Sequence, residues 1–448
     1  MTRPEAEGAG ETDVARLAEA CVGCGLCNAS CPTYLISGDE REGPRGRIAL
    51  IADLAAGAVD LTASPELAGH LERCLGCGAC QEVCPTGVEY DHLLAHGRGF
   101  LRATRRRASL RRQIDRIAGE VVPYPDRLRR YLRLRPLMAR LGGGRRGPGA
   151  RLARQIEALP QARAAFPGPG TAKTKREKRG RVILLQGCGG QVLRPSINDA
   201  AIRVLARNGL DVEVVAGAGC CGATLGEQGD REGQRRLARA NIDAWAKSLS
   251  RAPADAILST AGGCGLAIAD YADLLSDDPD YREKAQEIAG LAEDVVAFAA
   301  RFGLAPPLRW SSLRVACHVS CALARNGGGE QQLSLVHQAG FSAVEAAPEA
   351  TCCGGRVTFP YRQGELADAL RRQTSDAIGQ SRADVVATGS LACLMHLAGD
   401  LSQPVVHTIE LIDWAHGGPV PPGLEHLAGD VTDVPGASKL DVDDFISA

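Results

Sequence analysis

The sequence predicts an α+β protein of several domains, in which a helical, cysteine-rich first domain precedes a duplicated α/β unit with parallel sheets. Eight of the 17 cysteines fall within the first 100 residues, in two runs of identical spacing. From residue 181 onward, short β-branched runs alternate with longer stretches of helical periodicity, an order typical of parallel sheets. That order, with its cysteines, occurs twice and indicates an internal duplication. The expected domains span residues 1–100, 101–180, 181–305 and 306–448.

The composition excludes several classes of protein. The chain of 448 residues has 52 Lys and Arg against 53 Asp and Glu, which argues against a global role at nucleic acid or at a membrane surface. No run reaches the roughly 18 apolar residues of a membrane span, and the start, MTRPEAEGAG, does not have the regions of a signal peptide. We expect a cytoplasmic protein without a transmembrane segment, with peripheral attachment to the inner face of the membrane left open. In the reducing cytoplasm, an odd number of cysteines favours metal ligation over disulfides.

The first domain is predicted from two runs that each fit the pattern C-x2-C-x2-C-x3-C-P. In such runs three thiolates bind one [4Fe–4S] cubane, and the fourth binds the partner cluster. We therefore expect crossed ligation. The expected ligands are Cys21, Cys24, Cys27 and Cys84 for cluster one, and Cys74, Cys77, Cys80 and Cys31 for cluster two. A pair of zinc sites is the alternative, but zinc does not explain identical runs that end in proline. Because 43 positions separate Cys31 from Cys74, this two-cluster ferredoxin domain should be helical.

The second segment is strongly basic. Residues 101–181 contain 24 Lys and Arg against five acidic residues, and they end in the stretch GPGTAKTKREKRGR, which we interpret as a linker. Leucine and isoleucine recur at roughly helical spacing in LRRQIDRIAGE and YLRLRPLMARL, so part of the segment should be amphipathic helix. A nucleic-acid arm is one interpretation, but few aromatic residues are present for stacking on bases. A solvated helical face, or a docking site for an acidic partner subunit, is the preferred interpretation.

The duplicated unit has four cysteines in each block, and both blocks contain an adjacent Cys-Cys-Gly (CCG) motif. The cysteines are Cys188, Cys220, Cys221 and Cys264 in the first block, and Cys321, Cys352, Cys353 and Cys393 in the second. They follow predicted strands, so the carboxyl ends of a parallel sheet should gather them. Four soft thiolates select an iron–sulfur cluster or zinc, and buried apolar cysteines are the alternative.

A dinucleotide fingerprint also occurs by pattern. Residues 217–222 read G-x-G-x-x-G, and Asp243 follows about twenty residues later. We reject this interpretation because Asp243 falls within a predicted helix and the second block loses the fingerprint.

Together these motifs resemble the family of glycolate oxidase (glycolate dehydrogenase) iron–sulfur subunits. More broadly they resemble the CCG-domain family, which includes lactate-utilisation proteins, subunits of anaerobic glycerol-3-phosphate dehydrogenase and the B subunit of heterodisulfide reductase. The resemblance rests on CVGCGLCNASCPTYLISGDEREGPRGRI, GCCGA, RANIDAW, TAGGCG and GSLACLMHL. His318-Val-Ser-Cys321 is similar to the family's HxPC element, which favours Cys321 over Cys317 as the ligand. Where heterodisulfide reductase has a fifth cysteine in each block, this chain has Ala261 and Ser390.

The resemblance implies an electron-transfer subunit of a flavin-dependent 2-hydroxy-acid dehydrogenase, with FAD on partner flavoprotein subunits and a quinone or another acceptor. It also implies two N-terminal [4Fe–4S] clusters and one further cluster in each CCG block. Cys317 is a candidate fifth ligand in the second block. We expect no catalytic residue on this chain, no nucleic-acid partner, and no activity of the chain alone. His318 and His396 lie close to ligand cysteines and are either structural or cluster-tuning residues. The rival interpretation is a thiol/disulfide oxidoreductase with catalytic CCG clusters.

Overall fold

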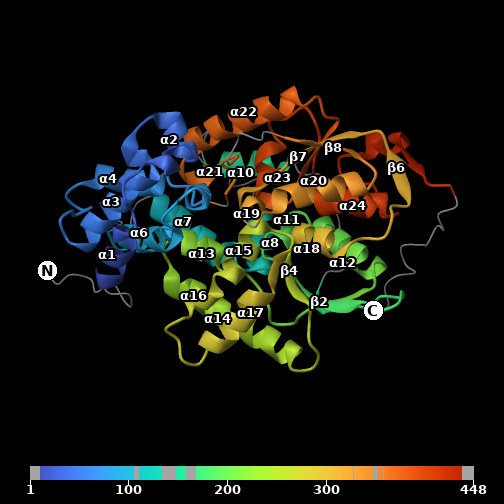
Figure 1. The fold of residues 1–448 in the computed structure, drawn as a ribbon, viewed down its shortest axis with the longest axis horizontal. Helices are drawn as coiled ribbons and strands as arrows, with labels where there is room; N and C mark the ends of the chain where they lie inside the picture. Colours follow the sequence, from blue (N-terminus) through green and yellow to red (C-terminus); the bar gives the residue numbers. More distant parts are fainter. Residues whose placement is uncertain are drawn as a thin grey trace.

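The computed structural model describes residues 11–104, 110–133, 148–157, 168–325, 327–346, 352–356 and 358–435. The cysteine-rich first domain lies at one end of the molecule, and the two α/β blocks lie beside it (Figure 1).

The first domain is helical, as predicted. Three of its helices begin with a proline, which fits the first turn because proline there needs no backbone N–H bond. Helices α3 and α6 pack together around Ile51 and Leu93, which are fully buried. The helices are α1 (Glu11–Glu19), α2 (Pro32–Ser37), α3 (Pro44–Ala55), α4 (Pro65–Glu72), α5 (Ala79–Glu82) and α6 (Tyr90–Thr104), with short 3-10 turns η1 (Leu26–Asn28) and η2 (Glu40–Glu42).

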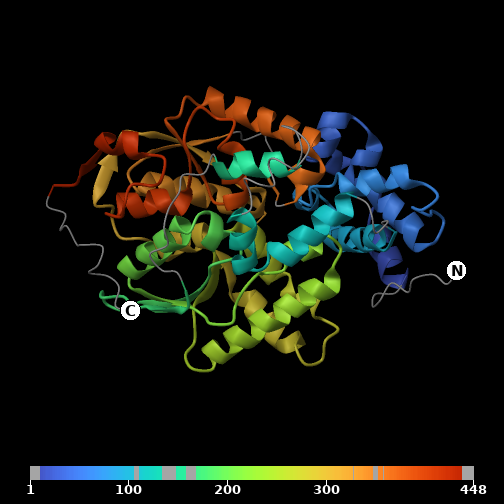
Figure 2. The ribbon, with the colours of Figure 1, turned by 180° about the vertical axis from the view of Figure 1, so that it is seen from behind.

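The basic segment forms helices that lie along the back of the two α/β blocks (Figure 2). They are α7 (Leu110–Val121), α8 (Pro125–Arg133) and α10 (Pro148–Glu157). Arg151 of α10 pairs with Asp368 of the second block, and Lys178, also in the basic segment, pairs with Asp211 of the first block. Part of the excess positive charge is therefore matched by carboxylates of this same chain.

The first block contains a five-stranded sheet in the order β1-β3-β2-β4-β5, parallel except where β1 meets β3. Strand β1 lies in the stretch expected to be a linker, and it adds an antiparallel edge. The strands are β1 (Gly170–Ala172), β2 (Gly180–Leu185), β3 (Leu210–Val214), β4 (Ala256–Ser259) and β5 (Ala292–Asp294). The helices are α11 (Gly190–Leu193), α12 (Ser196–Arg207), α13 (Ala223–Glu227), α14 (Arg231–Leu249), α15 (Gly262–Ala269), α16 (Tyr271–Leu274), α17 (Arg282–Leu291) and α18 (Val295–Phe302).

The second block repeats this topology. Its parallel sheet has the order β10-β9-β7-β8, which matches β5-β4-β2-β3 and confirms the predicted pair of parallel-sheet blocks. The strands are β7 (Arg314–His318), β8 (Ser342–Glu345), β9 (Val385–Thr388) and β10 (Val405–His407), and the helices are α19 (Cys321–Ala324), α20 (Gly328–Gln338), α21 (Phe359–Arg362), α22 (Gly364–Gln380), α23 (Leu391–Leu397) and α24 (Thr408–Ala415). Beyond them, β6 (Arg309–Ser311) pairs with β11 (Val431–Asp433), which follows η3 (Glu425–Asp430).

The two blocks share one hydrophobic core. Helix α12 of the first block packs on α24 of the second, and α18 packs on α20. Helices α12 and α20 follow the equivalent strands β2 and β7, and helices α18 and α24 follow the equivalent strands β5 and β10. The two helix contacts between the blocks are therefore nearly symmetric. Buried ion pairs between Arg203 and Asp413 and between Arg194 and Glu410 cross the same contact. The sheets are therefore held in a fixed relative position.

Candidate metal centres

The two ferredoxin-type runs fold into similar loops that approach each other. Glycines at positions 23, 25, 76 and 78 have positive φ values between 63° and 80°, a backbone conformation that favours glycine. These turns bring three cysteines of each run to one side of the loop. The residue type at those positions is thus required by the shape of the loops.

The structure places the fourth cysteine of each run with the other run. Cys84 lines one cavity with Cys21, Cys24 and Cys27, and Cys80 of the second run lines it too, while Cys31 lies near Cys77 and Cys80. Two hydrogen bonds support this exchange. The Ser30 hydroxyl donates to the Ala79 carbonyl at 3.2 Å, and the Thr86 hydroxyl donates to the Ala20 carbonyl at 2.8 Å. This placement is the one that crossed ligation requires.

The first three thiols of the second run lie deeper than the first three of the first run. Burial, followed by the neighbouring Cys352, raises the pKa of Cys77 to about 12. Burial also raises the pKa of Cys74, but Arg47 and Arg98 outweigh that effect and lower it overall. Of the 17 cysteines, all of which the structure describes, Cys24 alone is exposed.

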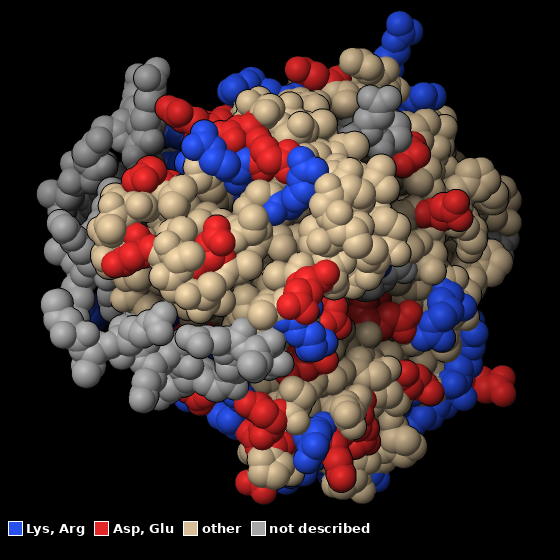
Figure 3. Space-filling model, turned by 60° about the vertical axis from the view of Figure 1, so that its left-hand side comes forward, with Lys and Arg blue, Asp and Glu red and all other residues tan. Residues whose placement is uncertain are grey.

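Exposed apolar side chains gather on these same loops. Val22 and Leu26 flank Cys24 and are 68% and 59% exposed, and Val83 of the second run is 44% exposed. Figure 3 turns this end of the molecule toward the viewer. Most of the face seen there is formed by residues other than Lys, Arg, Asp and Glu, and acidic and basic side chains are interspersed among them.

The first CCG block brings its four cysteines together. Cys188 follows β2, the pair Cys220 and Cys221 follows β3, and Cys264 lies in the first turn of α15 after β4. The Cys220 thiol interacts with those of Cys188 and Cys221, and the Cys221 thiol interacts with that of Cys264. The carboxyl ends of neighbouring parallel strands gather these side chains, as the sequence predicts.

The second CCG block repeats the arrangement. Cys352 interacts with Cys321 and Cys353, and Cys353 interacts with Cys393. In both blocks the glycine after the pair has a positive φ, and its N–H donates to the first thiol of the pair at 3.4 Å. These bonds explain the glycine of each CCG motif.

The thiols of each quartet affect one another's ionisation. Hydrogen bonds from the neighbouring thiols lower the pKa of Cys220 and of Cys352 well below the ordinary value. Hydrogen bonding to those two thiols, together with burial, raises the pKa of Cys188 and Cys321. The four sulfurs of each quartet therefore lie close together in a buried place.

Each set consists of four soft thiolates, which an iron–sulfur cluster or zinc would take. Zinc would need all four sulfurs about 2.3 Å from one atom, whereas a cubane would spread the four thiolates over a larger body. In the described part of the chain, no three His, Cys, Asp or Glu side chains come together closely enough to hold a single metal ion. The donor sets therefore fit an iron–sulfur cluster by their chemistry.

Sequence reasoning did not assign roles to two residues that support the first quartet. The Asn241 side-chain amide donates to the Cys220 carbonyl at 3.0 Å and accepts from the Gly219 N–H at 2.7 Å. The Tyr271 hydroxyl donates to the Cys221 carbonyl at 2.9 Å. Asn241 belongs to the stretch RANIDAW, which carried the resemblance without a stated function. Asp243, two residues later, bonds to Tyr281 and lies within α14, as expected when the dinucleotide fingerprint was rejected.

The other candidate residues have structural partners. Cys317 lies in the core on β7, where burial raises its pKa to about 12, and its thiol contacts the Val315 carbonyl. His318 bonds to Thr388 at 3.1 Å, and His396 bonds to the Ala367 carbonyl at 3.3 Å. Burial lowers the pKa of both histidines to about 4.

Comparisons with known proteins define the class and then the family. A 4Fe–4S dicluster domain model matches residues 17–88, and a cysteine-rich domain model matches residues 182–269 and 315–398. The protein is thus a dicluster iron–sulfur protein with a duplicated cysteine-rich domain. It is 34% identical to the glycolate oxidase iron–sulfur subunit of Escherichia coli (strain K12), over 88% of this chain and 93% of that protein. The chain therefore belongs to the family of glycolate oxidase iron–sulfur subunits.

More distant relatives extend the comparison. The probable glycolate oxidase iron–sulfur subunit of Bacillus subtilis (strain 168) is 27% identical over 84% of this chain and 87% of its own length. Lactate utilization protein A of Shouchella clausii is 23% identical over 50% of this chain and 92% of its own length. Within the described residues, no helix has both the length and the apolar character needed to cross a membrane.

Proposed function

We propose that this chain holds four iron–sulfur clusters and relays electrons from FAD-bearing flavoprotein subunits that oxidise a 2-hydroxy acid of the glycolate type. The gathering of 16 cysteines into four sets of four carries the proposal. Cys21, Cys24, Cys27 and Cys84 would hold one [4Fe–4S] cluster, and Cys74, Cys77, Cys80 and Cys31 a second. One cluster in each CCG block would be held by Cys188, Cys220, Cys221 and Cys264, and by Cys321, Cys352, Cys353 and Cys393.

The arrangement of the four sets supports a relay. Iron–sulfur clusters supply one-electron steps, which a two-electron flavin needs when its acceptor takes electrons singly or lies far away. Cys77 of the second run lies beside Cys352 of the second CCG block, so one proposed cluster site of the N-terminal domain is adjacent to one of the CCG unit. The exposed Cys24 offers a point at which a partner protein could approach. We infer a quinone or another electron acceptor, and a cytoplasmic location with peripheral attachment to the inner face of the membrane left open.

The test combines analysis of the chain with activity of the complex. We expect anaerobically purified chain to contain iron and sulfide for more than two [4Fe–4S] clusters, to contain no flavin, and not to oxidise glycolate or lactate with an artificial acceptor. Activity should appear when the flavoprotein subunits are co-expressed. Oxidation of a hydroxy acid by the flavin-free chain would contradict the proposal, and flavin-free reduction of a disulfide would favour the thiol/disulfide oxidoreductase instead.

A further inference from the structure

The two ferredoxin-type runs have the same spacing but different surroundings. In the first run, a Cβ at Gly23 would meet nothing within 4 Å, and a Cβ at Gly25 would meet only the Arg45 guanidinium. Arg45 is half exposed and pairs with Glu40. Solvent therefore covers much of this loop.

The second run is enclosed by arginines from three parts of the chain. A Cβ at Gly76 would lie 3.0 Å from Nη1 of Arg356 and 3.2 Å from Nη2 of Arg98, and a Cβ at Gly78 would collide with Arg325. Arg98 comes from α6, whereas Arg325 and Arg356 come from the second CCG block. Glycine at position 76 thus allows two guanidiniums to approach the loop that carries Cys74 and Cys77.

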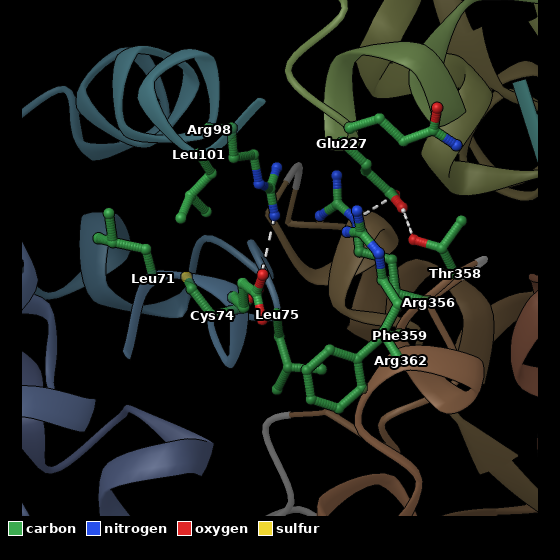
Figure 4. Close-up of a pocket in the computed structure, with 12 residues that line it drawn as sticks. Leu71, Cys74, Leu75, Arg98, Leu101, Glu227, Arg356, Thr358, Phe359 and Arg362 are labelled. Carbon is green, nitrogen blue, oxygen red and sulfur yellow. Dashed lines mark hydrogen bonds and ion pairs between the residues drawn. The ribbon is translucent and has the colours of Figure 1, made fainter. Parts of the chain in front are cut away.

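Two of these arginines, Arg98 and Arg356, line a cavity between the first domain and the two CCG blocks (Figure 4). Arg98 donates to the Cys74 carbonyl at 3.5 Å. Arg356 donates to the Gly76 carbonyl and pairs with Glu227 of the first block. Arg356 also acts electrostatically on Cys77 and Cys321, so it lies between the second run and the second CCG quartet.

The three arginines differ in whether a carboxylate pairs with them. Arg356 has Glu227 and Arg325 has Asp91 as partners. Arg98 has no carboxylate within ion-pair distance in the part of the chain that the structure describes. An arginine side chain is positive at neutral pH. Glu227 acts on Arg98 electrostatically, and Glu72 lines the same cavity. Arg98 thus places beside Cys74 a positive charge that no ion pair among the described residues neutralises.

We propose that Arg98 and Arg356 are positioning residues that selectively raise the reduction potential of the cluster held by Cys74, Cys77, Cys80 and Cys31. This inference rests on the proposed function, because it requires that cluster. Reduction adds one electron from an external reductant and leaves the cluster more negative by one charge. A nearby cation stabilises that reduced form, and it does so more strongly where water is excluded. Burial alone acts in the opposite direction, so the arginines offset the effect of enclosing the second run.

The test is a spectroscopically monitored redox titration of the full chain, reduced anaerobically with dithionite. In Arg98→Gln the midpoint of the second-run cluster should shift to a more negative potential, while the first-run cluster should not move. Arg98→Lys keeps the positive charge, so its second-run cluster should keep a midpoint potential close to that of the wild type. Arg356→Gln should lower the midpoint potentials of two clusters, the second-run cluster and the cluster of the second CCG block. The matched control Arg45→Gln should shift only the first-run cluster, and by less, because solvent screens Arg45. A Cys24→Ser background identifies the first-run signal.

The outcomes separate charge from structure. Equal shifts in Arg98→Gln and Arg98→Lys would overturn the proposal, as would a shift of both N-terminal clusters or of neither. Arg98→Gln decides the question, because Arg98 makes a single long hydrogen bond and its loss should not unfold the domain. The titration needs neither hydroxy acid nor partner subunit. A chain that shows these shifts but never supports hydroxy-acid oxidation would therefore refute the proposed function and leave this inference standing.

Discussion

Cys77 of the second ferredoxin-type run lies beside Cys352 of the second CCG motif. Leu75 and Phe359 pack with Cys352 in a small apolar cluster that Cys77 also contacts. The electrostatic effect of Cys352 on Cys77 confirms how close the two thiols are. Two sites from distant parts of the sequence thus share one apolar contact, and the cysteine pair of the second CCG block is a neighbour of the second run.

The crossed arrangement of the N-terminal cysteines can be tested by exchanging single ligands. Because Cys84 lies with the thiols of the first run, Cys84→Ser should perturb the first-run cluster and leave the second intact. Cys31→Ser should do the reverse. Electron paramagnetic resonance of the reduced variants, with iron analysis, distinguishes the two clusters. Loss of the second-run signal alone in Cys84→Ser would show that ligation is not crossed.

Asn241 should be necessary for the first CCG quartet. Asn241→Ala removes bonds to Gly219 and Cys220 and leaves their backbone groups buried without a partner, which costs about 1–3 kcal/mol. We expect a lower melting temperature and loss of iron from the first block, with the second block unchanged. The control is Asp243→Asn on the exposed side of the same helix, which should have little effect. If both variants retained the same amount of iron, the proposed role of Asn241 would be contradicted.

Asp413 should be essential to the contact between the blocks. It accepts bonds from Arg203 at 2.7 Å and Arg207 at 3.1 Å. Asp413→Ala leaves two buried guanidiniums without their carboxylate, and breaking such a pair typically costs about 3–5 kcal/mol. Arg301→Ala, which removes a mostly exposed pair with Glu293, should cost at most about 1 kcal/mol. Thermal unfolding of both variants checks the difference, and similar losses would contradict it.

Asp294 should make stability depend on pH. It caps α18 through its bond to the Val296 N–H at 2.8 Å, and burial raises its pKa to about 7. A carboxyl group whose folded pKa is raised destabilises the fold as pH rises from its unfolded pKa, about 4, to about 7, because the unfolded state ionises first. Asp294→Asn should keep the cap and remove this dependence. Its free energy of unfolding should exceed that of the wild type at pH 8, and the difference should shrink toward pH 6. A difference that does not change with pH would contradict the assignment.

Local patterns were sufficient to predict the sets of cysteines. The spacing within each run and the strands before each CCG pair determine which thiols are close, so the quartets and the parallel sheets could be expected from the sequence. The environment of each quartet could not, because it comes from distant segments. Arg356 reaches Gly76 across the domain boundary, and Asn241 reaches Cys220 from another helix.

The basic segment shows the same limit. Its charge suggested a solvated helical face or docking to another subunit, yet Arg151 pairs with Asp368 and Lys178 pairs with Asp211 within the chain. Net charge by segment does not reveal which carboxylates the fold brings near. Strand β1 was missed for a similar reason, since three residues at a sheet edge have too short a pattern to distinguish from a loop.

The bonds from Ser30 to Ala79 and from Thr86 to Ala20 have a consequence for biogenesis. As the nascent chain leaves the ribosome, the first three cysteines emerge early, but Cys84, which crossed ligation makes their fourth companion, emerges only after the rest of the second run. With crossed ligation the second site is complete once Cys80 has emerged, whereas the first site cannot be completed by a fragment that stops short of Cys84. Delivery of iron and sulfide to the first site must therefore either wait for the entire domain or proceed through partly liganded states that a carrier protein would have to protect from oxygen.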